Sequence, residues 1–172
     1  MTLWAAVLAA CLLGSAGANA RADAPTAAPD EQALAVLGTW HAPAGDDSGR
    51  ASIVELFLRD GQLYGRILRT VDAQGAEIDA ACKGCPDDLA GQPLKGMTFV
   101  RDLKPDGDRW VDGRVMDLRP GWTQGMVGIC EIRMVGDRLE LFGYRGLRAL
   151  GETSTWTRIG DTVARPEAVA AP

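Results

Sequence analysis

ASIVELFLRDGQLYGRILRT, residues 51–70, contains the plainest structural signal in the chain. Its two apolar runs flank Asp60-Gly61, a dipeptide that favours a tight hairpin turn because both positions tolerate positive φ. Neither run shows the sustained 3.6-residue spacing of an amphipathic helix. We therefore expect two antiparallel strands, Ala51–Leu58 and Gln62–Thr70, joined by this turn.

Short apolar runs and turn signals alternate in the same way through the rest of residues 34–160. A polar segment, 71–93, follows the first hairpin, and 31–37 is suited to one or two helical turns. The further strands that we expect are Gly38–Ala42, Met97–Leu103, Arg109–Asp117, Thr123–Val135, Arg138–Tyr144 and Glu152–Ile159. Lys104–Gly107 and Gly136-Asp137 supply two of the turns between them.

Eight consecutive antiparallel strands leave two exposed edges unless the sheet closes on itself. Closure gives an interior wide enough for side chains or one small ligand. Glycines that permit sharp coiling occur once in each of four strands, at Gly65, Gly113, Gly128 and Gly143. The sequence thus predicts an all-β, eight-stranded antiparallel up-and-down barrel with a short N-terminal helical turn. A two-sheet sandwich is the alternative.

The composition is that of one globular domain: 172 residues, of which 47% are hydrophobic. The formal net charge is −5, and the chain has no run rich in lysine or arginine. This balance argues against nucleic-acid partners and against attraction to anionic lipid.

The N-terminus reads as an export signal. Residues 1–20 carry no charged side chain, residues 3–13 are apolar, and Ala18-Asn19-Ala20 matches the cleavage rule for signal peptides. The segment is too short for a comfortable membrane span. We expect a signal peptide at 1–20, a flexible lead-in at 21–33, a barrel domain at 34–160 and a disordered tail at 161–172. The location would be the periplasm or the exterior. The alternative is a lipoprotein anchored at Cys11, because Leu8-Ala9-Ala10-Cys11 looks like a lipobox.

Both ends of the barrel segment resemble the lipocalin and wider calycin pattern. Gly38-Thr39-Trp40 opens the first strand, and Thr155-Trp156-Thr157-Arg158 closes the last. The resemblance implies that Trp40 plugs one barrel end while the Arg158 guanidinium stacks across it. Gly38, Trp40, Trp156 and Arg158 are then structural residues, not ligand contacts.

A wider set of motifs resembles the bacterial domain-of-unknown-function family 2147. These motifs are Gly38-Thr39-Trp40, Gly65-Arg66-Ile67, Pro93–Met97, Lys104–Gly107 with Trp110, Gly113–Asp117, Gly143–Gly146, Leu150-Gly151 and Thr155–Arg158. The resemblance implies a secreted calycin-like barrel with no settled activity. The chain departs from the family at 117–121, where the family more often has Asp-Pro directly, so a function placed in that loop does not carry over.

Cys82-Lys83-Gly84-Cys85-Pro86 is the most reactive-looking motif. In an oxidising compartment the two cysteines favour a local disulfide. A redox-active pair and a zinc site completed by Cys130 and His41 are the alternatives. A c-type haem site fails, because Pro86 stands where a histidine is needed. Cys130 is expected to be a small buried hydrophobe, or else to pair with Cys82 or Cys85.

No catalytic constellation is apparent. His41 is the only histidine and has no nucleophile motif nearby, so we expect a protein that is not an enzyme and uses no cofactor and no metal. Candidate ligand contacts at a polar barrel mouth are Glu55, Arg66, Arg114, Asp117 and Tyr144. The alternative is that these groups face solvent or pair with one another.

Three functions remain open at this point. The first is a non-enzymatic envelope protein that binds a small amphipathic or apolar molecule in the barrel interior or mouth. The second is a structural or protein-interaction module of the envelope that uses loops 71–93 and 118–122 as its surface. The third is a thiol or metal function at Cys82 and Cys85.

Overall fold

The computed structural model describes residues 29–159. The elements are α1 (Glu31–Leu34), β1 (Gly38–Pro43), β2 (Ala51–Arg59), β3 (Gln62–Val71), β4 (Glu77–Ile78), η1 (Asp87–Leu89), β5 (Thr98–Asp106), β6 (Arg109–Met116), β7 (Val127–Val135), β8 (Arg138–Tyr144), η2 (Arg148–Leu150) and β9 (Glu152–Arg158). Among these residues no helix has the length and apolar character needed to cross a membrane. The expected signal peptide, Cys11 and the expected C-terminal tail lie outside the described residues.

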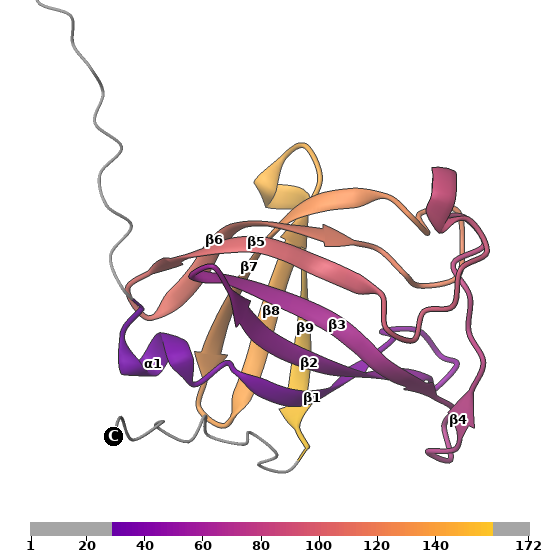
Figure 1. The fold of residues 1–172 in the computed structure, drawn as a ribbon, viewed down its shortest axis with the longest axis horizontal. Helices are drawn as coiled ribbons and strands as arrows, with labels where there is room; N and C mark the ends of the chain where they lie inside the picture. The colour runs from indigo at the N-terminus through magenta and orange to yellow at the C-terminus, as the bar shows by residue number, and fades with distance from the viewer. Residues whose placement is uncertain (1–28, 160–172) are drawn as a thin grey trace, which may run out of the picture.

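The strands form one antiparallel sheet that closes on itself (Figure 1). Their order is β2-β1-β9-β8-β7-β6-β5-β3-β4, and an additional pairing of β2 with β3 completes the ring. Eight strands make the barrel, and β4 adds a short pairing at the end of β3. The predicted all-β, eight-stranded antiparallel barrel is confirmed, and the two-sheet sandwich is excluded.

The first hairpin forms as the sequence predicts. Asp60 and Gly61 have φ of 51° and 76°, the positive values that a tight turn between two twisted strands requires. Arg59 pairs with Gln62 across this turn, and the ladder continues to Ala51 opposite Val71. A bulge at Ile53 and Val54 bends the strand as the sheet coils around the barrel.

The barrel interior is packed with apolar side chains. Trp40 and Trp110 have no exposed surface, and Trp156 is only 3% exposed. Leucine, valine and isoleucine from five strands fill the space around them: Val54, Leu56, Leu63, Val100, Leu103, Ile132, Leu139 and Leu141. Gly113 shows how tight this packing is, because an added Cβ would lie 2.1 Å from Leu103 Cγ. Burial of this surface is the main stabilising contribution to the fold.

Helix α1 closes one end of the barrel (Figure 1). Asp30 caps the helix by accepting a hydrogen bond from the Ala33 amide at 2.7 Å. The Trp110 indole donates to the Ala33 carbonyl, and the Trp40 indole donates to the Val36 carbonyl, both at 2.8 Å. Each ring therefore satisfies its own buried N–H while fixing the helix on the barrel end.

Some predicted boundaries were wrong. The sixth predicted strand begins at Val127, not Thr123, because 123–126 turn back on themselves through a Met126 N–H to Thr123 carbonyl bond. The fourth predicted strand, Met97–Leu103, in fact continues as β5 to Asp106 and so includes Lys104 and Pro105, where a turn was expected. The fold also starts before residue 34, since α1 begins at Glu31 and Ala33 is fully buried.

Candidate functional site

The other barrel end carries a cap, which we define as residues 80–97 and 117–126. Its first part is a closed loop: the Cys82 amide donates to the Gln92 carbonyl at 2.9 Å, and the Gly91 amide donates back to the Cys82 carbonyl at 2.8 Å. The Leu94 amide donates to the Ala80 carbonyl at 2.8 Å, which aligns the two sides of the loop. The cap lies at the end of the barrel opposite α1 (Figure 1).

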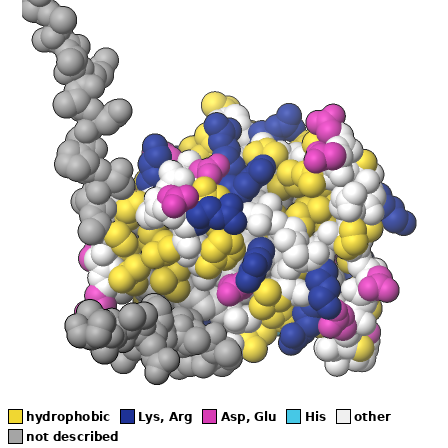
Figure 2. Space-filling view, in the orientation of Figure 1, with side chains coloured by type: hydrophobic (Ala, Val, Ile, Leu, Met, Phe, Trp, Pro, Cys, Tyr) yellow, Lys and Arg dark blue, Asp and Glu magenta, His cyan; other side chains and the backbone are white. Residues whose placement is uncertain are grey.

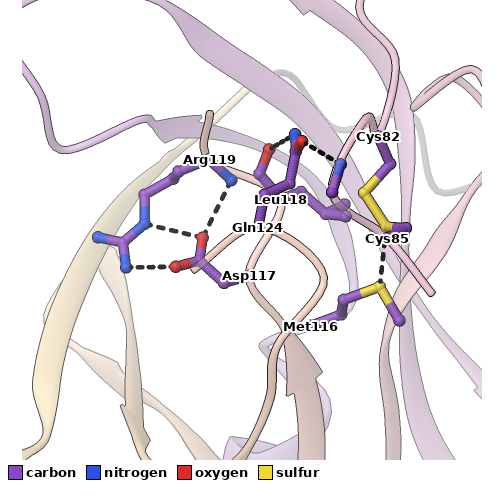
Figure 3. The surroundings of a disulfide bond; sticks show 8 residues. Cys82, Cys85, Met116, Asp117, Leu118, Arg119 and Gln124 are labelled. Carbon is purple, nitrogen blue, oxygen red and sulfur yellow. Dashed lines mark hydrogen bonds and ion pairs between the residues drawn. A yellow bond between two sulfur atoms is a disulfide. The ribbon is translucent and has the colours of Figure 1, made fainter. Parts of the chain in front are cut away.

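The disulfide Cys82–Cys85 lies inside this cap (Figure 3). Both cysteines are buried, and they pack with a second apolar cluster made of Ile67, Leu94, Met116 and Leu118. Cys85 Sγ lies 3.5 Å from Met116 Sδ at the end of β6. The predicted local disulfide is therefore present, and it anchors the cap on the barrel.

Gln124 joins the two parts of the cap (Figure 3). Its Oε1 accepts a hydrogen bond from the Gly84 amide at 2.9 Å, while its Nε2 donates to the Leu118 carbonyl at 3.1 Å. Gly125 permits the close approach of the two chains, since it has φ of 87° and an added Cβ would lie 2.5 Å from the Gly84 carbonyl oxygen. The two loops that the sequence proposed as a recognition surface, 71–93 and 118–122, thus meet at one end.

Asp117 and Arg119 stiffen the second part of the cap. The Arg119 guanidinium donates to both carboxylate oxygens of Asp117, at 2.9 and 2.8 Å, and its other terminal nitrogen lies 3.2 Å from the Glu152 carboxylate. Burial alone would raise the pKa of Asp117, but the hydrogen bonds from Arg119 and Thr123 outweigh burial and hold that pKa below its usual value. Asp117 is therefore an ionised structural anchor at neutral pH.

A groove of about 480 Å³ lies between the cap and β5. Its apolar lining is Leu89, Pro93 and Met97, and its polar lining is Asp88, Gln92, Thr98 and Arg101. The groove is shallow and largely open to solvent, so a ligand in it would stay partly exposed. The mixture of apolar and charged lining suits an amphipathic molecule.

A second, smaller groove of about 220 Å³ lies on the outer face of β6 to β9. Arginines dominate its rim, but each one is already paired: Arg109 with Asp106 at 3.0 Å, Arg133 with Glu140 at 2.8 Å, and Arg148 with Glu131. The hydrogen bond from Arg148 lowers the pKa of Glu131 and so keeps its carboxylate charged. These mutual pairs leave little uncompensated charge for a ligand.

The five candidate ligand contacts at the barrel mouth lie apart from one another, except for one pair. Glu55 and Arg66 face each other across β2 and β3 on the outer surface, with Arg66 Nε 2.6 Å from Glu55 Oε2. Arg114 is exposed on β6, Asp117 is in the cap, and Tyr144 packs beside Phe142 with ring centroids 5.7 Å apart. Strand alternation gives the inward positions to their apolar neighbours, which excludes charged side chains from the core. A ligand role for the five residues stays a prediction.

The structural residues lie as the lipocalin resemblance implies. The Arg158 guanidinium carbon lies 4.2 Å from the centroid of the Trp40 ring. Arg158 also donates to the Leu37 carbonyl at 2.9 Å and to the Ala35 carbonyl. It therefore ties the last strand to the segment between α1 and β1. Trp156 is buried in the core, and Gly38 begins β1 with φ of 124°.

Cys130, the third cysteine of the described residues, and His41 are not brought together. Cys130 is buried and free, and burial, with a smaller effect of Glu131, raises the pKa of its thiol to about 12. His41 is half-buried on β1, opposite Ile53 and Thr157. Within residues 29–159 no group of three or more His, Cys, Asp or Glu residues is placed to hold a metal ion.

Sequence reasoning missed several residues that shape this end of the protein. Leu89, Met97 and Arg101 line the groove. Met97 was noted only as the end of the family motif Pro93–Met97, Leu89 only as part of loop 71–93, and Arg101 not at all. Trp110 was recognised only as part of a family motif, although it holds α1 as firmly as Trp40 does. Only the fold brings these residues to their positions.

A closed eight-stranded antiparallel barrel, plugged at one end by α1 and a tryptophan–arginine stack, defines a lipocalin-like protein. The chain belongs to the bacterial family described as "Uncharacterized protein conserved in bacteria (DUF2147)", whose model matches residues 38–158. The match confirms the resemblance drawn from the motifs.

One solved structure supports the fold independently. It is described as "Protein HP1028 from the human pathogen Helicobacter pylori belongs to the lipocalin family". The likeness has a TM-score of 0.59 and 23% sequence identity, and it covers 73% of this chain and 83% of that one. At this identity the likeness shows the fold alone. No curated protein matches the chain.

Proposed function

We propose that this protein is a non-enzymatic binding module of the cell envelope, and that it holds a small amphipathic molecule in the groove between the cap and β5. The observation that carries the proposal is the contrast between a lumen filled by Trp40, Trp110 and Trp156 and an open groove beside it. A ligand in the lumen would have to displace tightly packed side chains, at a cost of several kcal/mol. A ligand in the groove displaces only solvent.

The groove also has the anchoring that a binding site needs. Its cap side is held by the disulfide and by the Gly84–Gln124 hydrogen bond, so little order has to be gained when a ligand enters. Met97 in its lining is unbranched and polarisable, which lets this side chain adapt to ligands of irregular shape. The proposed location in the periplasm or outside the cell rests on the sequence of residues 1–20 and on the disulfide.

Native mass spectrometry of protein purified from its own envelope tests the proposal. We expect a small molecule to co-purify with the wild-type protein and to be lost from Met97→Gln. This substitution keeps the side-chain length but makes that part of the groove lining polar. Met134→Gln is the matched control, because Met134 packs at the edge of the core away from the groove lining. Equal occupancy in wild type and Met97→Gln would overturn the groove as the site.

A protein-interaction role is the second candidate, and one observation favours it. The most exposed large apolar side chains of the described residues are Trp122 at 85%, Leu150 at 75% and Leu147 at 70%. They lie on two adjacent loops that Arg119 and Glu152 connect. Cross-linking from position 149, between Leu147 and Leu150, should then capture one protein partner in the envelope, whereas capture that persists unchanged in Trp122→Ser would rule this surface out.

A thiol function has weaker support. Cys82 has no exposed surface, Cys85 is 5% exposed, and the raised pKa of Cys130 keeps that thiol protonated near neutral pH. Attack on the disulfide would first require the cap to open.

A further inference from the structure

Two arginines on neighbouring strands lack the ion-pair partners that several other arginines of the barrel have. Arg101 on β5 and Arg114 on β6 are directly opposite each other across the two strands. Within the described part of the chain neither guanidinium has a carboxylate oxygen within 4.0 Å, whereas Arg66, Arg109, Arg133 and Arg148 each have one. Like charges that face each other across a ladder destabilise a sheet, so this pair has a cost that nothing visible offsets.

Arg101 links this pair to the groove, because it is also part of the groove lining. The apolar lining is provided by Leu89, Pro93 and Met97 from the cap side. Asp88 is the acidic residue in the lining, and it does not form an ion pair with Arg101. The groove therefore offers apolar lining beside the Arg101 side chain, and Arg114 stands opposite Arg101 on the neighbouring strand. Figure 2 shows this kind of surface, with Lys and Arg side chains set among hydrophobic ones on the face that includes β3 and β5.

We propose that Arg101 and Arg114 recognise the anionic head group, a carboxylate or a phosphate, of a single-chain amphiphile whose apolar chain lies along Leu89, Pro93 and Met97. The inference rests on the proposed function and names the ligand class of the same groove. Two guanidinium groups can donate several hydrogen bonds to one carboxylate or phosphate. The bound anion also removes the repulsion between the two arginines.

Because the net charge is −5, we expect the anionic head group to be recognised by direct contact and not by long-range attraction. An acidic protein does not attract anions from a distance, so affinity has to come from contact with the arginine pair. Thermal unfolding of the unliganded protein gives a test that does not depend on binding. Arg114→Gln removes the like-charge repulsion, so its unfolding midpoint should equal or exceed that of wild type. A drop in the midpoint would show that Arg114 has a structural role instead.

Calorimetric titration of the full chain with four probes tests the head group. The probes are dodecanoate, dodecyl phosphate, dodecyltrimethylammonium and dodecanol, all below their micelle-forming concentrations. We expect the two anions to bind and the cation and the alcohol to bind at least tenfold more weakly, with the tighter anion identifying the head group. Arg101→Gln and Arg114→Gln should each weaken anion binding about tenfold or more, the loss of a charge-assisted hydrogen bond. Arg138→Gln, which changes an exposed arginine with no ion pair on β8, is the control and should bind as wild type does.

The outcomes separate the two proposals. If all four probes bind equally and Met97→Gln weakens them all, the groove is the site but the anionic head group is wrong. If dodecanoate and dodecyl phosphate bind but neither arginine variant changes their affinity, then the arginine pair does not recognise the head group, and this inference is overturned. If no probe binds, or Met97→Gln has no effect on any of them, the groove itself is not the site and both proposals are overturned.

Discussion

Gln124 Oε1 lies 2.9 Å from the Gly84 amide, and this bond joins the disulfide loop to the connection between β6 and β7. Gln124 is the one buried polar side chain found among residues 29–159, and both ends of its amide are used. The cap is therefore one unit made of two segments that are about 40 residues apart in the chain.

Gln124→Ala should loosen the cap. The Gly84 N–H and the Leu118 carbonyl would lose their partners, which costs about 1–3 kcal/mol of unfolding free energy when such groups stay buried. Urea unfolding measures the loss, and hydrogen exchange should accelerate at Gly84. Gln74→Ala, at an exposed glutamine in the turn before β4, serves as the control and should change neither quantity.

Acid should release the second half of the cap through Asp117. Its pKa is lowered in the folded state, so its contribution to stability is complete above the unfolded pKa of about 4 and is lost as pH falls through the folded pKa. Wild type should therefore have a larger unfolding free energy than Asp117→Asn near pH 7, and this difference should shrink below about pH 4. Urea unfolding at each pH measures it. A difference that stays constant from pH 7 to pH 3 would contradict the ionised anchor.

Glycine positions test how full the lumen is. Gly113→Ala places a Cβ 2.1 Å from Leu103 Cγ, and we expect overpacking to cost about 1–3 kcal/mol. Gly143→Ala is the matched control on β8, because its nearest neighbour would be Val115 Cγ1 at an ordinary 3.5 Å. Denaturant unfolding of the two variants compares them directly. Equal stability would mean that the interior has free volume, and a ligand in the lumen would then regain support.

Thiol labelling tests the three described cysteines. Cys130 is buried, and its pKa of about 12 leaves almost no thiolate at pH 8, so iodoacetamide should not modify it in the native protein. In denaturant without reductant the Cys130 peptide alone should be alkylated, and reductant should add Cys82 and Cys85. Rapid native labelling at Cys82 or Cys85 would contradict the disulfide.

Arg158→Ala should weaken the closed base of the barrel. The change removes the stack on Trp40 and leaves the Leu37 carbonyl without its donor, for a combined loss of about 2 kcal/mol. Arg158→Lys should recover only part of the loss, because an ammonium lacks the planar fork of a guanidinium. Arg59→Ala provides a comparison at another cation–π contact, since the exposed Arg59 lies 4.9 Å from the centroid of the half-buried Tyr64 ring. Arg59→Ala should lower stability less than Arg158→Ala does.

The sequence by itself determined the barrel, its hairpins and its base. Strand signals are local: Asp60-Gly61 sets a turn, apolar alternation sets which face is buried, and the tryptophan and arginine at the two chain ends of the barrel indicate its closure. The disulfide was also predictable, because two cysteines three residues apart can reach each other with little help from the fold.

The proposed ligand site depends on contacts that only the tertiary structure creates. Local pattern could not show that the lumen is filled, because packing depends on how eight strands coil around three tryptophans. Nor could it show that Gln124 meets Gly84, or that Arg101 faces Arg114 beside Met97, since strand register sets those contacts across the chain. Glu55 and Arg66 pair with each other, the alternative that the sequence left open, because charged groups on neighbouring strands pair on the outer face more readily than they enter an apolar core.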